Sequence, residues 1–415
     1  MRILWFCNTP SLASEHLGVQ SGESWVKALQ HYFENDNGTL GIAFYWEHAL
    51  PPFELNGTRY FPIHKNIGNA IYSKTLHRIQ SCYKAYPLFR VKQCEQVIND
   101  FAPDIIHIQG TENPFGLIKQ YTKIPVVVSI QGNLTVCSKF YFRSVDKFNV
   151  IRRTPFVHWL LYKDLFSRFR LFDLEARVEE TIFRLNTYFI GRTEWDRRVS
   201  LVLNPKRRYF YGGEILRKPF YENKWSFRRK EKYVLASVIR ANVYKGLETL
   251  VEAASLLKDK FKLDFTWKIV GIDKEDVIND VLDVRSKVND RIDFLGFMNE
   301  EKIIEVLLAS DIYIHPSHIE NSSNAVAEAQ LLGMPVIATY AGGTGSIVKD
   351  GETGVLIQDG DPWNLAGSII ELLADHEKMV QLGERAHRVA SKRHDPSIVY
   401  SDIKSIYTTI LENER

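Results

Sequence analysis

The chain has 415 residues, which is too long for one ordinary hydrophobic core and predicts about two or three domains. An apolar fraction of 45% and a charged fraction of 25% are typical of a soluble globular protein, and no run approaches the ~20 apolar residues that span a bilayer. The net charge of +3 gives no global attraction to nucleic acid, and four cysteines without paired spacing argue against a zinc site or a disulfide framework.

The first half of the chain alternates short apolar runs with helical patterns. Met1–Cys7 lacks a basic leader and a small-residue cleavage site, so we expect a buried first strand and a cytoplasmic protein. Asp104–Ile108 and Pro125–Ile130 are β-branched runs bounded by turn residues, which predicts two more strands. Strands separated by helices indicate a parallel sheet covered on both faces.

Residues 139–170 form a basic and aromatic stretch, with eight cations against two aspartates and nine interleaved aromatic residues. Trp159, Tyr162, Phe166 and Phe169 recur in it at helical spacing. Such a pattern suits an anionic membrane surface, which would make the protein peripheral on the inner face of the membrane. Packing of the same aromatic residues against the first domain explains the pattern equally well.

The second half predicts a further doubly wound unit. Its expected strands are Tyr233–Ile239, Phe265–Gly271, Arg291–Leu295, Asp311–His315, Pro335–Thr339 and Gly354–Ile357, and its expected helices include Gly246–Leu257, Asn299–Ala309 and Ala325–Leu332.

The basic, irregular stretch 204–232 separates the two halves, and we expect the hinge near residues 205–225. The predicted domains are therefore 1–212 and 213–394. A helical pattern over Asp395–Glu412, within the remaining residues 395–415, is placed to cross back to the first domain.

The most specific motif is the segment ENSSNAVAE, in which Glu320 and Glu328 flank seven residues just after an expected strand. Ser322 or Ser323 is placed to cap a helix that opens near Asn324. Free amides at such a helix start suit phosphate or sugar hydroxyls, and the two carboxylates can accept hydrogen bonds from hydroxyls. A surface helix with two solvated glutamates is the alternative interpretation.

Two flanking loops favour the first interpretation. Arg240–Gly246 (RANVYKG) follows the first strand of the second half and carries two cations five residues apart, which suit a diphosphate. Ala341–Gly345 (AGGTG) follows a later strand, where glycines let a backbone approach a ligand closely. An ordinary charged loop and a tight turn are the alternatives for these segments when each is taken alone.

Together these motifs resemble glycosyltransferase family 4 (group 1), whose members are retaining enzymes of the GT-B fold. The agreement covers residues 233–360, and the segment HPSHIENSSNAVAEAQ resembles bacterial members that build surface polysaccharides. The resemblance implies an α/β fold in which two Rossmann-like, doubly wound parallel-sheet domains face a central cleft. It also implies sugar transfer from a nucleotide-diphosphate sugar, most commonly a UDP-sugar, to a glycan or lipid-linked acceptor in capsule, O-antigen or exopolysaccharide synthesis.

The resemblance assigns roles to single residues. Arg240, Lys245 and Glu320 are the expected catalytic residues, because the two cations would neutralise the leaving diphosphate while Glu320 binds the hydroxyls of the donor sugar. The full set expected at the donor is Gly22, Arg240, Lys245, Phe297, Met298, Glu320, Ser323, Asn324, Ala325 and Glu328. In this set Glu328 binds the ribose, and Phe297 or Met298 meets the base. The residues expected on the acceptor side are His107, Glu112, Gln131 and Arg192.

Neither a metal nor a cofactor besides the donor is expected, because no convincing Asp-x-Asp pair is present and the two cations can replace a metal. The family pattern offers no placed nucleophile, so a front-face reaction is expected rather than the two-carboxylate scheme of hydrolases. A non-hydrolysing nucleotide-sugar epimerase and a catalytically inactive, donor-binding relative are the alternatives. No GxGxxG follows the first strand, which disfavours an NAD-dependent dehydrogenase, and nucleic acid is not an expected partner.

Overall fold

The computed structural model describes residues 1–19, 25–34, 39–64, 88–154, 164–228 and 231–414, which form two compact units. The first unit comprises Met1–Ser138, Phe156–Ile215 and Asp395–Arg415, and the second comprises Lys139–Pro155 and Leu216–His394. The chain thus passes between the units four times. Residues Lys139–Pro155, which sequence analysis placed with the first domain, pack with the second unit instead.

The first unit is built on an eight-stranded sheet in the order β3-β4-β2-β1-β5-β6-β7-β8. All neighbouring strands in it are parallel except β3 and β4. Its strands are β1 (Arg2–Cys7), β2 (Thr39–Trp46), β3 (Phe53–Leu55), β4 (Thr58–His64), β5 (Ile105–Gln109), β6 (Val126–Ser129), β7 (Tyr188–Gly191) and β8 (Arg208–Tyr211). The three strands predicted from sequence in this unit are confirmed as β1, β5 and β6.

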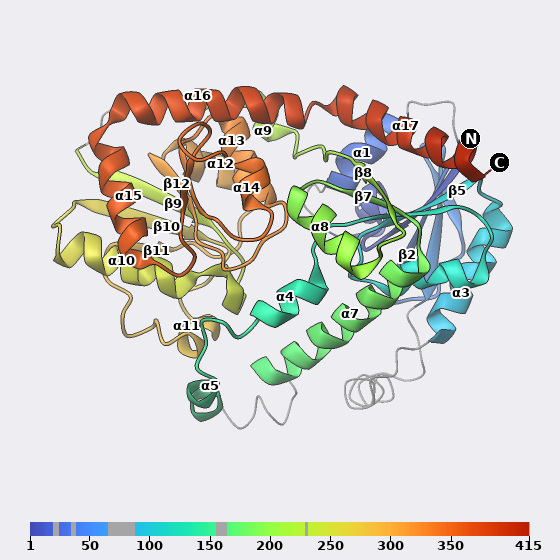
Figure 1. Cartoon of the computed structure of the whole chain (residues 1–415), viewed down its shortest axis with the longest axis horizontal. Coiled ribbons are helices and arrows are strands. Elements are labelled where there is room, and N and C mark those ends of the chain that lie inside the picture. Colours follow the sequence, from blue (N-terminus) through green and yellow to red (C-terminus); the bar gives the residue numbers. More distant parts are fainter. Residues whose placement is uncertain (20–24, 35–38, 65–87, 155–163, 229–230, 415) are drawn as a thin grey trace. The chain divides into compact units, whose positions relative to one another are not determined.

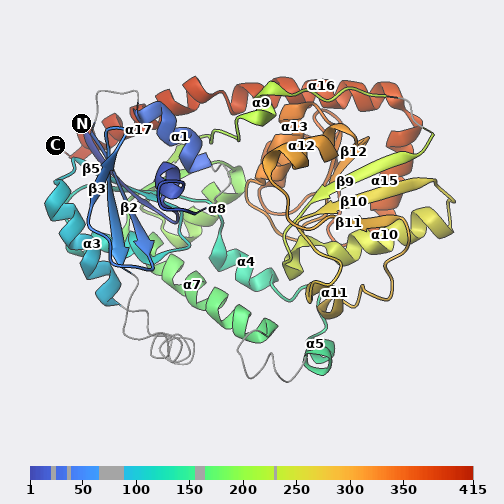
Figure 2. The same ribbon diagram turned by 180° about the vertical axis from the view of Figure 1, so that it is seen from behind.

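Helices cover both faces of this sheet. They are α1 (Trp25–Glu34), α3 (Leu88–Phe101), α4 (Leu134–Phe140), α7 (Leu165–Leu185), α8 (Glu194–Leu203) and α17 (Pro396–Glu414), with short 3-10 turns η1 (Ser11–Ser14) and η2 (Pro114–Tyr121). Figures 1 and 2 show α1 and α17 on one side of the sheet and α3 and α7 on the other.

The alternation of side chains along β1 explains the two layers. Leu4 and Phe6 belong to a buried cluster that includes residues of α3, η2 and α7. Trp5 points the other way, where its ring meets Phe33 of α1 edge-on and its indole donates to the Tyr407 hydroxyl of α17 at 3.1 Å. Because both faces are buried, every residue from Ile3 to Cys7 is apolar.

The second unit has an all-parallel, six-stranded sheet in the order β11-β10-β9-β12-β13-β14. Its strands are β9 (Tyr233–Val238), β10 (Phe265–Val270), β11 (Ile292–Phe294), β12 (Ile312–His315), β13 (Val336–Thr339) and β14 (Val355–Ile357). All six predicted strands are confirmed to within one or two residues at each end.

The helices of this unit also form two layers. They are α5 (Lys147–Arg153), α9 (Pro219–Glu222), α10 (Leu247–Asp259), α11 (Ile278–Val281), α12 (Glu300–Leu308), α13 (Asn324–Leu332), α14 (Thr344–Ile347), α15 (Pro362–Ala374) and α16 (His376–Arg393), with the 3-10 turn η3 (Val243–Lys245). Helices α10 and α15 pack together, and α13 packs against α9 and α16.

The predicted α/β class with two parallel-sheet units is confirmed. The stretch 204–232 is more regular than expected, because β8 occupies part of it as the edge strand of the first sheet. The carboxyl ends of parallel strands meet at one edge of each sheet, and the loops that leave this edge carry most of the residues proposed from sequence.

Candidate functional site

In the second unit, Lys245 and Glu320 form an ion pair between the loops that follow β9 and β12. Their side chains are 16% and 18% exposed, and His315 Nε2 lies 3.3 Å from the same Glu320 oxygen. Burial alone would raise the pKa of Glu320, but Lys245 and His315 outweigh it and lower the pKa to about 2. Glu320 is therefore ionised at neutral pH and acts as a hydrogen-bond acceptor.

Glycines fix the backbone of this ion pair. Gly246, with φ of 74°, lies so close to Pro316 that a Cβ on it would be 1.9 Å from the Pro316 carbonyl oxygen. Gly342, with φ of 55°, approaches the Glu320 carbonyl oxygen in the same way, at 2.0 Å from a built Cβ. The Gly343 amide donates to that oxygen at 2.8 Å. The three loops after β9, β12 and β13 are thus held together through their backbones.

Arg240, the second expected cation, follows β9 and is exposed. Within the described residues its guanidinium makes no hydrogen bond or ion pair with the protein, whereas Lys245 is paired. This edge of the sheet therefore offers one guanidinium that is free to bind an anion.

The start of α13 leaves backbone amides available. Ser323 occupies the N-cap position, but its hydroxyl makes no capping hydrogen bond, so the expected side-chain cap is absent there. In the part of the chain that the structure describes, the amides of Asn324 and Ala325 donate to no protein acceptor. Amides at a helix start attract anions and hydroxyl oxygens, which agrees with the role expected for these three residues.

Glu328 lies in the second turn of α13 and is 4% exposed. Both of its carboxylate oxygens accept hydrogen bonds from Arg217, which lies just after the point where the chain enters the second unit. Burial raises the pKa of Glu328, although Arg217 opposes this effect. Sequence analysis missed Arg217, because it stands in an irregular basic stretch where no spacing marks one cation from another.

Phe297 and Met298, expected to meet the base, follow β11. Phe297 is 92% exposed, whereas Met298 is partly buried against the core of the unit. The preceding Gly296 is held by backbone hydrogen bonds to Gly271 and Ile272 in the loop after β10. Exposure of this size leaves the Phe297 ring available for stacking.

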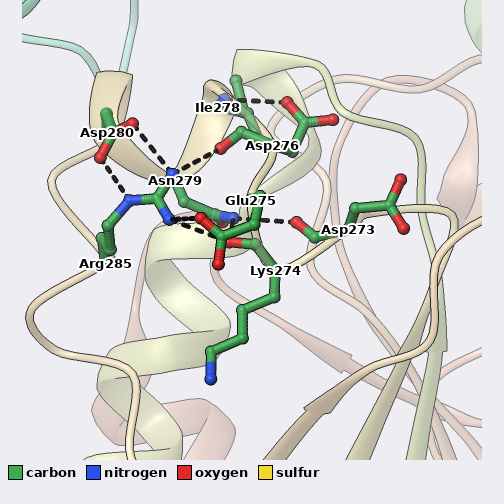
Figure 3. A network of polar contacts seen from close by, with 8 residues as sticks. All are labelled: Asp273, Lys274, Glu275, Asp276, Ile278, Asn279, Asp280 and Arg285. Carbon is green, nitrogen blue, oxygen red and sulfur yellow. Dashed lines mark hydrogen bonds and ion pairs between the residues drawn. The ribbon is translucent and has the colours of Figure 1, made fainter.

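The loop after β10 folds around Arg285 (Figure 3). Arg285 pairs with Asp280 and Glu275 and donates to the carbonyl oxygens of Lys274 and Asp276. These contacts use its donors within the loop itself. Arg285 therefore stabilises its own loop, whereas Arg240 is available to a ligand.

In the first unit the structure contradicts an acceptor contact for His107. Its side chain is fully buried inside β5, where Nδ1 lies 2.5 Å from the Tyr407 hydroxyl and Nε2 lies 2.7 Å from the Ser129 hydroxyl. Burial lowers the pKa of His107 to about 3, so the ring is neutral. The strand continues to Gln109, which keeps His107 away from the sheet edge.

Glu112 and Gln131 do come together at that edge. Asn8 donates to Glu112 Oε2 at 3.1 Å. With its amide oriented so that both the oxygen and the nitrogen have partners, Gln131 donates to Glu112 Oε1 at 3.1 Å. The Gln131 oxygen accepts from the Trp25 indole. Loops after β1, β5 and β6 thus build one polar cluster beside an aromatic ring, an arrangement that suits a sugar.

The last two residues expected in the first unit are Arg192 and Gly22. Arg192 pairs with the buried Glu214 at 2.8 Å, and its guanidinium lies 5.1 Å over the Trp25 ring. It is 11% exposed, so it supports Trp25 rather than reaching a ligand. Gly22 lies outside the described residues.

Two carboxyls on α7 lie close to the Glu112 cluster and were not predicted from sequence. Burial raises the pKa of Glu179 to about 7, although Thr111 and Thr135 donate hydrogen bonds to it. Burial, with a smaller contribution from Glu112, raises the pKa of Glu175 to about 7. Burial also raises the pKa of Glu112. No cation pairs directly with Glu179 among the described residues, so this edge favours neutral carboxyls.

The basic and aromatic stretch is only partly described, because Trp159 and Tyr162 lie outside the described residues. Within it, Phe148 and Ile151 of α5 are 70% and 54% exposed. Lys147 and Arg152 of the same short helix are also exposed. Among the described helices, none is long and apolar enough to cross a membrane.

The segment that carries α5 contacts the loop of Lys245. The Ser144 hydroxyl donates to the Val243 carbonyl at 3.3 Å, and Arg143 lies 3.4 Å from Asp359. Asp359 in turn contacts His318, which also pairs with Glu248. Burial alone would lower the pKa of His318, but the two carboxylates outweigh it and raise the pKa to about 9.

In the part of the chain that the structure describes, no three His, Cys, Asp or Glu side chains gather as metal ligands would. The expected metal independence stays a prediction.

Comparison with known proteins gives one family match. Residues 220–389 match the family model described as glycosyl transferases group 1. The match covers the loops of Arg240, Lys245, Glu320 and Glu328. Over these residues the chain matches the group 1 family that the sequence motifs predict.

Curated relatives match over part of their length. The N-acetyl-alpha-D-glucosaminyl L-malate synthase of Bacillus anthracis is 30% identical over 128 residues, which are 31% of this chain and 33% of that protein. The capsular polysaccharide biosynthesis glycosyltransferase CapM of Staphylococcus aureus is 24% identical over 200 residues, which are 46% of this chain and 50% of that protein. The matches thus span a third to a half of these two relatives.

Solved structures match over the whole chain. The sucrose-phosphate synthase of Thermosynechococcus elongatus has a TM-score of 0.73 and 16% identity, with all of both chains covered. HepE of Anabaena, solved in complex with UDP-glucose, has a TM-score of 0.66 and 17% identity, with 99% of this chain and 100% of that chain covered. These neighbours share the predicted GT-B fold.

Proposed function

We propose, for a chain whose residues 220–389 belong to the glycosyl transferases group 1, that it transfers a sugar from a UDP-sugar to a glycan or lipid-linked acceptor with retained anomeric configuration. The observation that carries this proposal is the Lys245–Glu320 pair, which Gly246 and Gly342 hold at the sheet edge and which shares the loop after β9 with the exposed Arg240. The pair supports the proposal because it joins a carboxylate, which can accept from sugar hydroxyls, to a cation at the edge where α/β sheets bind ligands.

The donor roles follow from charge. Arg240 and Lys245 bind the diphosphate and stabilise the negative charge that grows on it as the glycosidic bond breaks. Lys245 has three N–H donors, so it can keep its bond to Glu320 while it binds phosphate. Glu320, ionised at neutral pH, accepts hydrogen bonds from hydroxyls of the donor sugar. Glu328 binds the ribose hydroxyls, and the exposed Phe297 stacks on the base.

The anomeric outcome depends on which face of the sugar is attacked. Because Glu320 is paired with Lys245, it is a weak nucleophile and a good hydroxyl acceptor. We therefore place the acceptor hydroxyl on the same face as the leaving diphosphate. Its oxygen bonds to the anomeric carbon while the carbon–oxygen bond to the diphosphate breaks, and the departing phosphate takes the hydroxyl proton. No metal takes part in this scheme.

The proposed donor and acceptor classes rest on similar proteins and on the side chains of the first unit. HepE, which has the same fold, was solved with UDP-glucose, and this motivates a UDP-sugar as the first donor to test. CapM, a partial relative, acts in capsular polysaccharide biosynthesis, which motivates a glycan or lipid-linked acceptor. The cluster of Glu112 and Gln131 beside Trp25 suits a neutral sugar, because amides and carboxyls bind hydroxyls and an indole packs on a sugar face.

Binding of UDP-, GDP- and ADP-sugars should be measured in the presence of EDTA, for the wild type, Arg240→Ala and Lys274→Ala. Lys274 is an exposed cation of the loop after β10 and serves as the matched control. We expect selective binding of UDP-sugars that Arg240→Ala weakens about tenfold or more and Lys274→Ala leaves unchanged. Binding of no donor, or equal effects of the two variants, would contradict the proposal. Conversion of the donor without acceptor would favour an epimerase.

We also propose that α5 attaches the protein to an anionic membrane. Phe148 and Ile151 expose apolar surface between the cations Lys147 and Arg152, as an interfacial helix does. The double variant Phe148→Ser/Ile151→Ser should lose binding to vesicles that contain phosphatidylserine. Val202→Ser, which removes an 82% exposed apolar residue of α8, is the control. Equal binding by the double variant and the wild type would disprove this attachment.

A further inference from the structure

Arg217 holds the carboxylate of Glu328 with two parallel hydrogen bonds. Its Nε and Nη2 atoms donate to Oε1 and Oε2 of Glu328, each at 2.7 Å. The Glu328 side chain is 5% exposed and the Arg217 side chain 19%. A bidentate pair of this kind fixes the plane of the carboxylate as well as its charge.

The surroundings hold Arg217 in place. Its guanidinium lies 4.7 Å from the centre of the Phe220 ring, which is fully buried in α9. The amide of the preceding Leu216 donates to the Tyr221 hydroxyl at 2.9 Å. Helix α9 packs on α13, the helix that carries Glu328. The packed helix α9, which follows Arg217 in the chain, therefore holds the Arg217 guanidinium in contact with Glu328.

We infer that Arg217 is a positioning residue, which presents Glu328 to the ribose of the nucleotide as an ionised acceptor of fixed orientation. This inference rests on the proposed function. A carboxylate has about four acceptor sites on its two oxygens, and Arg217 uses one on each. The remaining sites can accept from the two neighbouring hydroxyls of a ribose. If the carboxylate could rotate freely, its two acceptor sites would no longer stay aligned with the two hydroxyls of the ribose.

The charges that face Glu328 make this support necessary. Burial is the largest cause that raises the pKa of Glu328, and among the described residues Glu300 of α12 raises it further, while the neutral phenol of Tyr313 in β12 also faces it. Without Arg217 the carboxyl would be protonated at higher pH than in the wild type. A protonated Glu328 loses acceptor sites and negative charge, so ribose binding would weaken as pH falls.

The test compares the binding of UDP and 2′-deoxy-UDP between pH 5.5 and 8.5 by the wild type, Arg217→Gln, Arg217→Lys and Glu328→Gln. We expect the wild type to prefer UDP about tenfold or more at every pH, since one hydrogen bond to a charged group is lost with the 2′-hydroxyl. Arg217→Gln should lose this preference at pH 5.5 and regain part of it at pH 8.5. Arg217→Lys keeps the charge but not the fork, so it should show a reduced preference that varies little with pH. Glu328→Gln should show little preference at any pH.

A purely structural role for Arg217 would weaken the binding of both nucleotides equally and leave the preference unchanged, which would overturn the inference. Tighter UDP binding by Arg217→Gln would overturn it too, because Arg217 would then compete with the ribose. If Arg217→Gln does not fold, Arg217→Lys decides between these outcomes through its preference alone. Failure of the wild type to bind either nucleotide would instead contradict the proposed function.

Discussion

The sheet edge of the second unit and that of the first gather polar side chains in opposite electrostatic states. In the second unit each acid has a cation: Lys245 pairs with Glu320, and Arg217 pairs with Glu328. In the first unit Glu112 contacts two amides, while burial raises the pKa of the neighbouring Glu179 to about 7. At one edge both of these acids pair with a cation, and at the other amides and hydroxyls contact carboxyls whose pKa burial raises.

This difference matches the two kinds of substrate in the proposed reaction. A diphosphate brings negative charge, which needs cations held in position by their own counter-ions. An acceptor hydroxyl is neutral, and a partly protonated carboxyl can both donate to it and accept from it. The contrast also extends to the backbone. In the second unit Gly342 lies against a carbonyl oxygen, whereas in the first unit Gly110 lies against the side chain of Glu112.

The largest expected effect tests this backbone contrast. Gly342→Ala should lower the free energy of unfolding by about 3 kcal/mol, because the new Cβ meets the Glu320 carbonyl and the backbone must move. Gly351→Ala, with φ of 71° and no atom within 4 Å of the new Cβ, should cost only about 1 kcal/mol. Hydrogen exchange of the amides in α13 measures the difference.

Gly110→Ala tests the same contrast in the first unit. Its neighbour is a side-chain oxygen that can rotate away, so we expect a smaller loss of stability than for Gly342→Ala. Equal losses for Gly342→Ala and Gly351→Ala would show that the backbone contact at Glu320 has no energetic weight, and the contrast between the two edges would then reduce to charge alone.

The second expected effect concerns pH and the first unit. Because the folded pKa of Glu179 is about 7 and its ordinary value is 4.5, the folded state binds the proton more tightly. Its contribution to stability is therefore complete below about pH 4.5 and is lost as pH rises through 7. The expected loss is about 2 to 3 kcal/mol. Glu179→Gln should flatten this dependence.

The neighbouring Glu180 provides the control for this measurement. It lies on the same helix and pairs with Arg184 at the surface. Urea unfolding of the wild type, Glu179→Gln and Glu180→Gln at pH 5, 6, 7 and 8 separates the two positions. If Glu180→Gln flattens the profile as much as Glu179→Gln, the buried carboxyl is not its origin.

The smallest expected effect concerns a charge cluster outside the proposed site. Arg285 is 39% exposed and pairs only with groups of its own loop in Figure 3. Exposed ion pairs contribute little, so Arg285→Ala should shift the melting temperature by about 2 °C or less and leave donor binding unchanged. Weaker donor binding by this variant would extend the charged edge beyond Arg240 and Lys245. Calorimetry and nucleotide titration measure the two quantities.

The sequence predicts the second sheet better than the first. In the second unit, six apolar runs alternate with clear helical patterns, and all six became strands. In the first unit, β2, β3, β4, β7 and β8 were not identified. Arg59 and Pro62 in β4, and Arg208 in the four-residue β8, interrupt the apolar pattern of two of these strands, so the pattern alone did not mark them.

At the site, sequence motifs marked single residues but not the ion pairs that these residues form in the structure. Motifs mark both Glu320 and Lys245 as donor residues, but the ion pair between these two residues was not predicted. Arg217 was missed because it lies 111 residues before Glu328 in the chain. Only the packing of α9 on α13 brings the two side chains together. His107 was misassigned for a related reason. In a strand buried on both faces, the sequence does not indicate whether a polar residue points to a ligand or to the core.

The bond between Trp5 and Tyr407 bears on how the chain is made. The ribosome adds Tyr407 402 residues after Trp5, which at roughly 5 to 20 residues per second is a wait of roughly 20 to 80 seconds. Leu216–His394 is synthesised without interruption during this interval. The residues of the second unit are thus all synthesised before the first unit receives α17, one of the two helices on that face of its sheet. The last helix to be synthesised therefore completes the sheet that is begun first.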